Sequence, residues 1–295
     1  MKLTIAIAIA TAGRRDVMTD TILRLSRQSR MADALLICPA KPQDFDAACL
    51  DAYGGEARVL AGPVGLPCQR NVLLAASTAD VVVFFDDDFL PCDDYLAELE
   101  LLFDAMPDVV IATGQVLADG ILGPGLDHQE GVRIIEDAGP NDASRATRPT
   151  YNGYGCNMAV RMRPVRERGL RFDENLPLYA WLEDLDFSRQ AAAHGTIVQA
   201  PRLRGVHLGV KKSGRSPGVR LGYSQVANPI YLARKGTMAW PLARTHMSRN
   251  MLANTARTLR PEPWVDRRGR LKGNLLALWD LARGRLDPRR ILEFK

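Results

Sequence analysis

The sequence predicts an α/β fold, with a mostly parallel, twisted sheet carrying helices on both faces and a basic helical C-terminal extension. Two observations support this prediction. Apolar runs of strand length alternate with segments of helical periodicity, which is typical of a doubly wound sheet with right-handed crossovers. Residues 244–295 hold 13 Lys or Arg against 5 Asp or Glu, so the basic excess of the chain is concentrated at its end.

The N-terminal third is predicted to contain three strands, each followed by a helix. In the first unit, residues 3–10 form an apolar strand, and Met18, Ile22 and Leu25 share one face of the following helix. Pro and Gly residues mark the loops between the later elements. These later elements are strands at 34–38 and 58–61 and helices at 44–53 and 68–77.

The fourth strand begins at Val81 with five consecutive apolar residues and is expected to lie fully buried at the centre of the sheet. Residues 114–150 are rich in Gly, Pro, Asp and Asn, and we expect an irregular insertion with one hairpin there. The other elements expected in this part are a helix from 91 or 93 to about 106, strands at 109–113 and 196–199, a glycine-lined approach to a strand at 151–160, and a helix at 181–194.

Length and composition suit one large domain with an appendage. The 295 residues are 46% hydrophobic, which is enough for a sizeable core. We divide the chain into residues 1–235, with halves 1–113 and 114–235, and an extension of residues 236–295. The first part is slightly acidic, and an acidic cleft repels nucleic acid, so we expect no nucleic-acid partner.

The cysteines and the N-terminus favour a cytoplasmic protein. The five cysteines are odd in number and form no C-x-x-C pair, which indicates reduced thiols. Residues 3–10 look like a minimal signal peptide, but their removal would delete the first strand, so a core strand is the simpler interpretation. No apolar run reaches the roughly 18 residues of a membrane span.

Three carboxylates, Asp86, Asp87 and Asp88, follow the fourth strand directly. Ligands of open α/β sheets bind at this end of the strands. Adjacent carboxylates repel one another unless a cation or hydrogen-bond donors compensate, and their hard oxygens suit Mg²⁺ or Mn²⁺. We therefore expect a divalent metal that holds a phosphorylated substrate.

A second acidic group, Glu183 and Asp184, opens the predicted helix at 181–194. One interpretation is ordinary complementarity with the helix dipole. The other is general-base chemistry, because the neighbouring Trp181 and Tyr179 provide partly apolar surroundings that raise the proton affinity of a carboxylate. The residues alone leave both interpretations open.

Together, these motifs make the chain resemble the inverting family-two glycosyltransferases of the GT-A fold, which is Rossmann-like. The resemblance covers about residues 3–235 and implies transfer of a sugar from a UDP- or GDP-sugar to a glycan, glycolipid or small-molecule hydroxyl. It rests on three segments in this order: Cys68-Gln69-Arg70-Asn71, the D-x-D segment Phe85-Asp86-Asp87-Asp88-Phe89-Leu90-Pro91, and the E-D motif Trp181-Leu182-Glu183-Asp184-Leu185-Asp186-Phe187.

The resemblance also implies roles for single residues. Asp184 matches the catalytic base, and Glu183 orients the acceptor. Asp88 and Asp86 match ligands of Mn²⁺ or Mg²⁺, and His207 matches a histidine that completes the metal site, although a lone histidine is as readily structural. The implied acceptor-binding residues are Trp181 and Tyr154, and the implied donor-binding residues are Thr11, Arg14, Arg70, Asp86, Asp87, Lys211 and Arg215.

One departure from the family pattern leaves the nucleotide base open. Many relatives carry Asp-Asp-Gly-Ser after the second strand, where the first Asp contacts uracil. Here the corresponding segment is Ile37-Cys38-Pro39-Ala40-Lys41-Pro42. Another basic segment, residues 211–218, is equally consistent with a solvated loop and with a loop that closes over phosphates.

Two alternative functions stay open. Sugar-phosphate nucleotidyltransferases also combine an α/β sheet with metal-binding acids, but they usually need a Gly-rich phosphate loop after the first strand. Here that loop, Thr11-Ala12-Gly13-Arg14-Arg15, is short and poor in glycine. The other alternative is a basic module without catalytic activity that binds a membrane surface or another partner. It accounts for the basic tail but not for the two acidic groups.

The extension is predicted to contain a basic amphipathic helix. Its apolar face comprises Leu271, Leu275, Leu278, Trp279 and Ala282. Such a helix lies on an anionic membrane, packs on its own domain, or joins a second subunit in a homodimer. We expect a cytoplasmic enzyme of bacterial polysaccharide or glycolipid assembly, which the first of these alternatives would bring to the inner face of the membrane.

Overall fold

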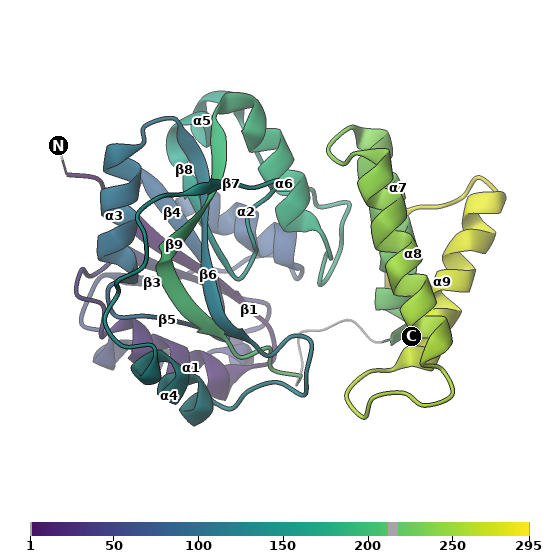
Figure 1. Cartoon of the computed structure of the whole chain (residues 1–295), viewed down its shortest axis with the longest axis horizontal. Helices are drawn as coiled ribbons and strands as arrows, with labels where there is room; N and C mark the ends of the chain where they lie inside the picture. Colours follow the sequence, from purple (N-terminus) through teal and green to yellow (C-terminus); the bar gives the residue numbers. More distant parts are fainter. Residues whose placement is uncertain (1, 212–217, 295) are drawn as a thin grey trace.

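The computed structural model describes residues 2–211 and 218–294. An α/β body forms the larger part, and three long helices near the C-terminus form a separate unit beside it (Figure 1). Residues 212–217 of the predicted basic loop, including the predicted donor-binding residue Arg215, lie outside the described residues.

A nine-stranded sheet forms the centre of the body, in the order β3-β2-β1-β4-β8-β6-β9-β5, with β7 paired to β9. The first four strands in this order are parallel, as is the β6–β9 pair, whereas β8, β5 and β7 are antiparallel to their partners. The sheet is therefore mixed, not mostly parallel. The strands are β1 (Ile5–Thr11), β2 (Ala34–Pro39), β3 (Ala57–Val59), β4 (Val81–Asp86), β5 (Phe89–Pro91), β6 (Val109–Asp119), β7 (Arg148–Pro149), β8 (Asn157–Arg161) and β9 (Thr196–His207).

Strand β8 is antiparallel because of where the chain enters it. The segment before it lies at the carboxyl end of β4, where the Asp86 N–H donates to the Cys156 carbonyl. From there the chain can only run back along β4 in the opposite direction. The segment that precedes β8 therefore lies beside the aspartate triplet, at the carboxyl end of β4.

Alternate residues of the central strands face two separate hydrophobic cores, as expected for strands buried on both faces. In β1, Ile5 and Ile7 face a core closed by α1 and α3, while Ala6 and Ala8 face one closed by α2, α5 and α6. The helices of the body are α1 (Arg15–Leu25), α2 (Leu66–Ala76), α3 (Tyr95–Ala105), α4 (His128–Asp137), α5 (Met162–Arg168) and α6 (Glu183–Ala191).

The predicted irregular insertion at 114–150 is wrong in its first half. Strand β6 continues to Asp119, and α4 follows, with the Asp127 side chain capping it by accepting from the Glu130 N–H. Ile135 of α4 packs against a small core that includes Leu208. The apolar residues of this helix form one short run, residues 132–135, and the many Gly, Pro, Asp and Asn residues on either side of it favour a loop.

Other boundaries also differ from the prediction. The segment 44–53 forms two short 3₁₀ helices, Pro42–Asp44 and Ala47–Ala52, and Pro91 belongs to β5, so that α3 begins only at Tyr95. Strand β9 extends to His207, which is therefore a strand residue. Pro201 interrupts the apolar pattern of β9, and a proline normally argues against a continuing strand.

The C-terminal helical unit consists of α7 (Gly218–Lys235), α8 (Trp240–Ala256) and α9 (Arg267–Ala282). Helices α7 and α9 approach closely at two glycines. A Cβ on Gly222 would lie 2.0 Å from the Arg270 carbonyl oxygen, and one on Gly273 would lie 2.1 Å from that of Val219. Helix α7, which precedes the predicted boundary at residue 235, thus packs against the predicted extension.

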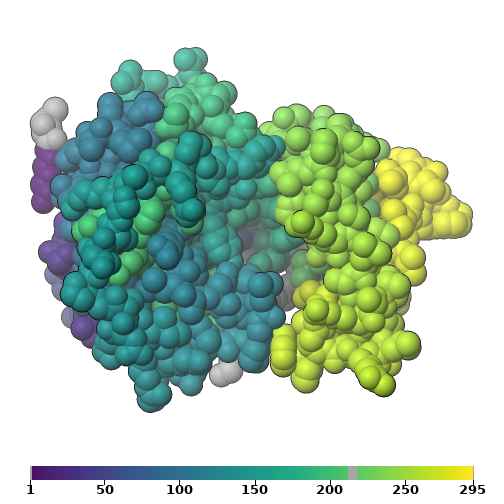
Figure 2. All heavy atoms as spheres, viewed as in Figure 1, coloured from purple at the N-terminus to yellow at the C-terminus, as the bar shows by residue number. Residues whose placement is uncertain are grey.

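The helical unit lies against the side of the α/β body (Figure 2). An apolar cluster joins them, in which Leu176 and Leu185 of the body contact Leu232 and Met238 of the helical unit. Within the described residues, no helix is both long and apolar enough to cross a membrane.

Candidate active site

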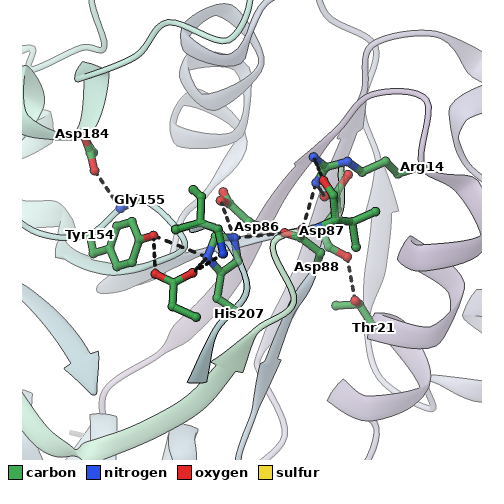
Figure 3. A network of polar contacts seen from close by, with 12 residues as sticks. Arg14, Thr21, Asp86, Asp87, Asp88, Tyr154, Gly155, Asp184 and His207 are labelled. Atoms are coloured by element: carbon green, nitrogen blue, oxygen red, sulfur yellow. Dashed lines mark hydrogen bonds and ion pairs between the residues drawn. The ribbon is translucent and has the colours of Figure 1, made fainter. Parts of the chain in front are cut away.

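The aspartate triplet lies at the carboxyl end of β4, beside the end of β1 (Figure 3). The two strands are in parallel register, with Ala10 opposite Asp86. Thr11, the next residue of β1, therefore reaches the triplet, and its Oγ1 donates to Asp87 Oδ2 at 2.6 Å. Because the chain turns after Asp86, the three carboxylates point to different partners.

Asp86, Asp88 and His207 form a group that could hold a metal ion, since one ligand atom from each lies within 4.8 Å of the others. His207 Nε2 is 3.4 Å from Asp88 Oδ1 and 3.9 Å from Asp86 Oδ2. Among the described residues, the buried Asp88 Oδ1 makes no hydrogen bond and faces only the His207 ring as an ion pair, so a metal ion there would satisfy it. Two carboxylates and one imidazole fit a divalent cation such as Mn²⁺.

The pKa values of this group show that Asp88 and His207 stabilise each other in their charged forms. Burial alone would raise the pKa of Asp88, but the adjacent His207 outweighs it and lowers the pKa to about 2. Burial alone would lower the pKa of His207, but the hydrogen-bonded Asp119 carboxylate and the charge of Asp88 raise it to about 10. A metal ion at this site would therefore compete with a proton on the imidazole.

Asp87 points away from the group, toward Arg14 (Figure 3). Arg14 Nη1 lies 2.7 Å from Asp87 Oδ1 and 3.2 Å from Asp88 Oδ2. Burial raises the pKa of Asp87 to about 6. The Arg14 guanidinium opposes this shift, and the like charge of Asp88 adds to it. Arg14 thus compensates two carboxylates of the triplet at once.

A backbone N–H in a turn that requires glycine holds Asp88 from the other side. The Val210 N–H donates to Asp88 Oδ2 at 2.8 Å. The preceding Gly209 has a φ of 62°, and a Cβ there would lie 2.4 Å from the carbonyl carbon of Gly120. Only glycine fits both the left-handed backbone and the close approach.

The triplet opens into a cavity of about 440 Å³, which is large enough for part of a nucleotide sugar. The predicted donor-binding residues Thr11, Arg14, Asp86 and Asp87 line it. Its wall also contains Asp88, His207, Ala40, Lys41, Gln69, Tyr179 and Arg220, of which the last comes from α7.

Arg70 is buried and joins the triplet to the E-D motif. Its Nη2 donates to Asp86 Oδ1 at 3.1 Å and to the Gly155 carbonyl at 2.8 Å, while its Nη1 donates to Glu183 Oε1 at 2.7 Å. Glu183 is buried as well, and burial raises its pKa to about 8. Within the described structure, Arg70 and Glu183 contact side chains of the site and are not part of the cavity wall.

Asp184 is partly exposed at the start of α6. Its Oδ2 accepts from the Gly155 N–H at 2.9 Å (Figure 3), and its Oδ1 accepts from the Leu185 N–H at 2.8 Å. Burial raises the pKa of this carboxyl, although the two amides counteract the shift. Two backbone donors therefore fix the orientation of the carboxylate.

The backbone before α6 is strained. Leu178, Ala180 and Leu182 have φ angles of 60°, 50° and 76°, in the left-handed region that such residues rarely adopt. Each position costs about 1–3 kcal/mol, and such positions cluster at functional sites. The segment brings Tyr179 to the cavity and leads into Glu183 and Asp184.

Asp119 is a site residue that the sequence analysis missed. Its Oδ1 lies 2.9 Å from His207 Nδ1, and its Oδ2 accepts from the Tyr154 hydroxyl at 2.9 Å. Tyr154, predicted to bind the acceptor, also contacts the His207 ring edge-on. Asp119 went unnoticed because it falls within the stretch expected to be irregular.

The remaining predicted residues lie around this centre. Trp181 contacts His246 of α8 edge-on, with ring centroids 5.8 Å apart, and its carbonyl accepts from Asn228 of α7. The Lys211 ammonium donates to the carbonyls of Gly120 and Ile121. Trp181 therefore lies where the E-D motif meets the helical unit.

Comparison with known proteins gives structural matches only. The sequence matches no protein-family model and no curated protein. GalNAc-T7 with UDP, GalNAc and Mn²⁺ superposes with a TM-score of 0.59 at 14% identity, over 99% of this chain and 57% of that one. The mannosyltransferase PcManGT from Pyrobaculum calidifontis, with GDP-Man and Mn²⁺, gives 0.56 at 15% identity, over 99% and 85%.

A third match is TarS of S. aureus. The TarS 1–349 structure gives a TM-score of 0.56 at 14% identity, over 99% of this chain and 90% of that one. In another TarS structure the match covers 77% of this chain but only 40% of TarS, with a TM-score of 0.51. The structural matches and the position of the Asp86-x-Asp88 group agree on the architecture, and the chain has the GT-A glycosyltransferase fold.

Proposed function

We propose that this protein is a metal-dependent inverting glycosyltransferase that moves a sugar from a UDP- or GDP-sugar to a hydroxyl acceptor. The observation that carries the proposal is the cavity at the end of β4, where Asp86, Asp88 and His207 could hold a cation beside Thr11 and Arg14. Solved structures of the same fold contain UDP or GDP-Man together with Mn²⁺.

Asp184 is the proposed base. The acceptor oxygen forms a bond to the anomeric carbon while the bond from that carbon to the diphosphate oxygen breaks. Asp184 accepts the hydroxyl proton, and the nucleoside diphosphate leaves with the bonding electrons. This single displacement inverts the anomeric carbon. A bound Mn²⁺ or Mg²⁺ supplies Lewis-acid stabilisation of the diphosphate charge.

The surroundings of Asp184 support this role. Its carboxylate is partly exposed and held by two backbone N–H groups, whereas the neighbouring Glu183 is buried against Arg70. A base must reach the acceptor, and Asp184 is the more accessible of the two carboxylates. We assign Glu183 a positioning role, because it accepts a hydrogen bond from Arg70, which also contacts Asp86. We assign Trp181 a role in binding the acceptor.

The proposal also covers the site for the nucleotide base of the donor and the biological role of the enzyme. Ala40 and Lys41 line the cavity at the place where relatives carry the uracil-contacting Asp, so this segment is the proposed site for the nucleotide base.

We place the activity in bacterial polysaccharide or glycolipid assembly, with glycans, glycolipids or small molecules as acceptors.

We also propose that α9 contacts the inner face of the membrane. Leu275 and Trp279 are more than half exposed, and the exposed Arg268, Lys272 and Arg283 lie on the same outward side of the helix. Basic residues with an interfacial tryptophan suit an anionic lipid surface.

The test of the proposed activity uses the full chain. UDP- and GDP-sugars are screened for thermal stabilisation with Mn²⁺ and with Mg²⁺, and the stabilising donor is then used in binding and transfer assays. Asp184→Asn should bind this donor like the wild type but lose about 10²–10⁴-fold in transfer rate, because it cannot accept the proton. Asp88→Asn should lose metal-dependent donor binding.

Asp104→Asn, an exposed carboxylate of α3, is the matched control and should behave like the wild type. Normal turnover by Asp184→Asn would show that the base is another group. If no nucleotide sugar stabilised the wild type with either metal, the proposed donor class would be wrong.

A further inference from the structure

We infer that Asp119 is the positioning residue that orients His207 toward the cation site. The inference rests on the proposed metal-dependent function, because it concerns the same site. Asp119 and His207 are directly paired across β6 and β9, and the Gly120 N–H donates to the His207 carbonyl. The two side chains therefore emerge side by side at the end of a strand pair.

Strand register makes this pairing possible. The β6–β9 ladder contains three irregularities, the last of them between Val116 and Ala118. A shift of one residue exchanges the faces of a strand. The irregularity directly before Asp119 thus sets which side chain of β6 faces His207, and bulges of this kind commonly re-aim side chains next to active sites.

The contacts assign one nitrogen of His207 to each task. Asp119 Oδ1 lies 2.9 Å from Nδ1, and a carboxylate only accepts, so Nδ1 carries a hydrogen. Nε2 consequently points to Asp86 and Asp88, at 3.9 and 3.4 Å. A carboxylate behind a metal-binding histidine fixes the ring and strengthens it as a ligand.

Asp119 is itself held in place. Its Oδ1 accepts from the Ile121 N–H at 3.0 Å, and its Oδ2 accepts from the Tyr154 hydroxyl at 2.9 Å. The carboxylate thus has three donors, none of which belongs to the triplet. This arrangement explains why a charged side chain at the exposed end of β6 points at a histidine rather than at solvent.

The test measures Mn²⁺ binding to the full chain at fixed pH, without sugar nucleotide, from the EPR signal of free Mn²⁺. Asp119→Ala should weaken Mn²⁺ binding about 10–100-fold. Asp119→Asn keeps a hydrogen-bond acceptor without the charge, so it should recover part of the affinity. Asp127→Ala, which removes the α4 cap in the same region without touching His207, should leave the affinity unchanged.

A His207→Ala background separates positioning from a general structural effect. If Asp119 acts through His207, Asp119→Ala should cause no further loss of Mn²⁺ affinity in this background. Equal losses in both backgrounds, or wild-type affinity in Asp119→Ala, would overturn the inference alone. A wild-type chain that bound no Mn²⁺ would overturn the proposed metal site and this inference with it.

Discussion

Arg70 shows how much of this site depends on a single buried cation. Its guanidinium is 2% exposed and lies between Glu183 and Asp86, which belong to the two acidic motifs. Phe84 and Phe172 pack against the same group, with centroids 5.2 and 5.5 Å from its carbon. Without Arg70, the buried Glu183 would lose its charge partner, and the partly exposed Asp86 would keep His207 nearby.

We predict that Arg70→Met destabilises the fold by about 3–5 kcal/mol, the usual cost of removing one partner of a buried ion pair. The free energy of unfolding in urea measures the effect. Arg70→Met combined with Glu183→Gln should recover part of the loss, because the buried acid that has lost its partner is then replaced by a neutral amide. A loss below about 1 kcal/mol would contradict the buried pairing.

At the residue scale, the sequence specified where the acidic motifs lie along the chain but not which side chains contact them. Asp86 and Asp88 follow a wholly apolar strand, so their place at the sheet edge could be predicted. Arg70 was expected to bind the donor, and its contacts with Asp86 and Glu183 were not predicted. Its partner Glu183 lies 113 residues away, and no local pattern encodes a contact at that separation.

At the scale of elements, α7 is attached to the body through two buried carboxylates. Lys235 at its end lies 2.6 Å from Asp173 and 2.7 Å from Asp186, and Tyr231 donates to Asp173 at 2.7 Å. Burial alone would raise the pKa of Asp173, but Lys235 and Tyr231 outweigh it and lower the pKa below its usual 3.8. The helical unit is therefore tethered partly by the ionised carboxylate of Asp173.

This attachment should depend on pH. A carboxyl whose pKa is lower in the folded state adds stability above pH 3.8, and this stability is lost as the pH falls through the lowered pKa. Asp173→Asn should therefore cost about 1.5–3 kcal/mol at neutral pH, the worth of hydrogen bonds to a charged group, and much less in strong acid.

Urea unfolding followed by tryptophan fluorescence measures this effect. All four tryptophans, at 181, 240, 264 and 279, lie in the helical unit or against it, so the signal reports on this attachment. Glu167→Gln is the control, because its pair with Arg163 is mostly exposed. A difference between Asp173→Asn and the wild type that stayed constant down to strong acid would contradict the linkage.

Two of the errors of prediction at this scale share one cause. Strands β6 and β9 were predicted too short because Gly114 and Pro201 break the apolar pattern. In the structure, Gly114 is the residue that fits there, since a Cβ would lie 2.0 Å from the Leu203 carbonyl oxygen. Pairing with a distant strand, not local preference, extended both elements.

At the scale of the whole molecule, the helical unit turns one basic face outward. Helix α9 packs on α7 through Gly273, Asn274 and Ala277, and it lies on the side of the unit away from the body (Figure 1). The predicted apolar face is divided accordingly, because Leu278 packs inward while Leu275 and Trp279 stay exposed.

We predict that the full chain floats with vesicles containing anionic lipid and much less with neutral ones. The Leu275→Ala/Trp279→Ala double variant should reduce this binding, since it removes the apolar contacts of α9. Leu101→Ala, an exposed leucine of α3, is the control. Unchanged flotation of the double variant, or concentration-dependent self-association through α9, would contradict the membrane contact.

The sequence by itself determined the α/β class, the central β4 strand and the two acidic motifs. It did so because these features depend on local polarity and on the period of apolar residues. The tertiary structure decided the rest: the mixed direction of the strands, the pairing of Asp119 with His207, and the burial of Arg70 between both motifs. Each of these depends on register and contact between segments far apart in the chain, which local patterns do not specify.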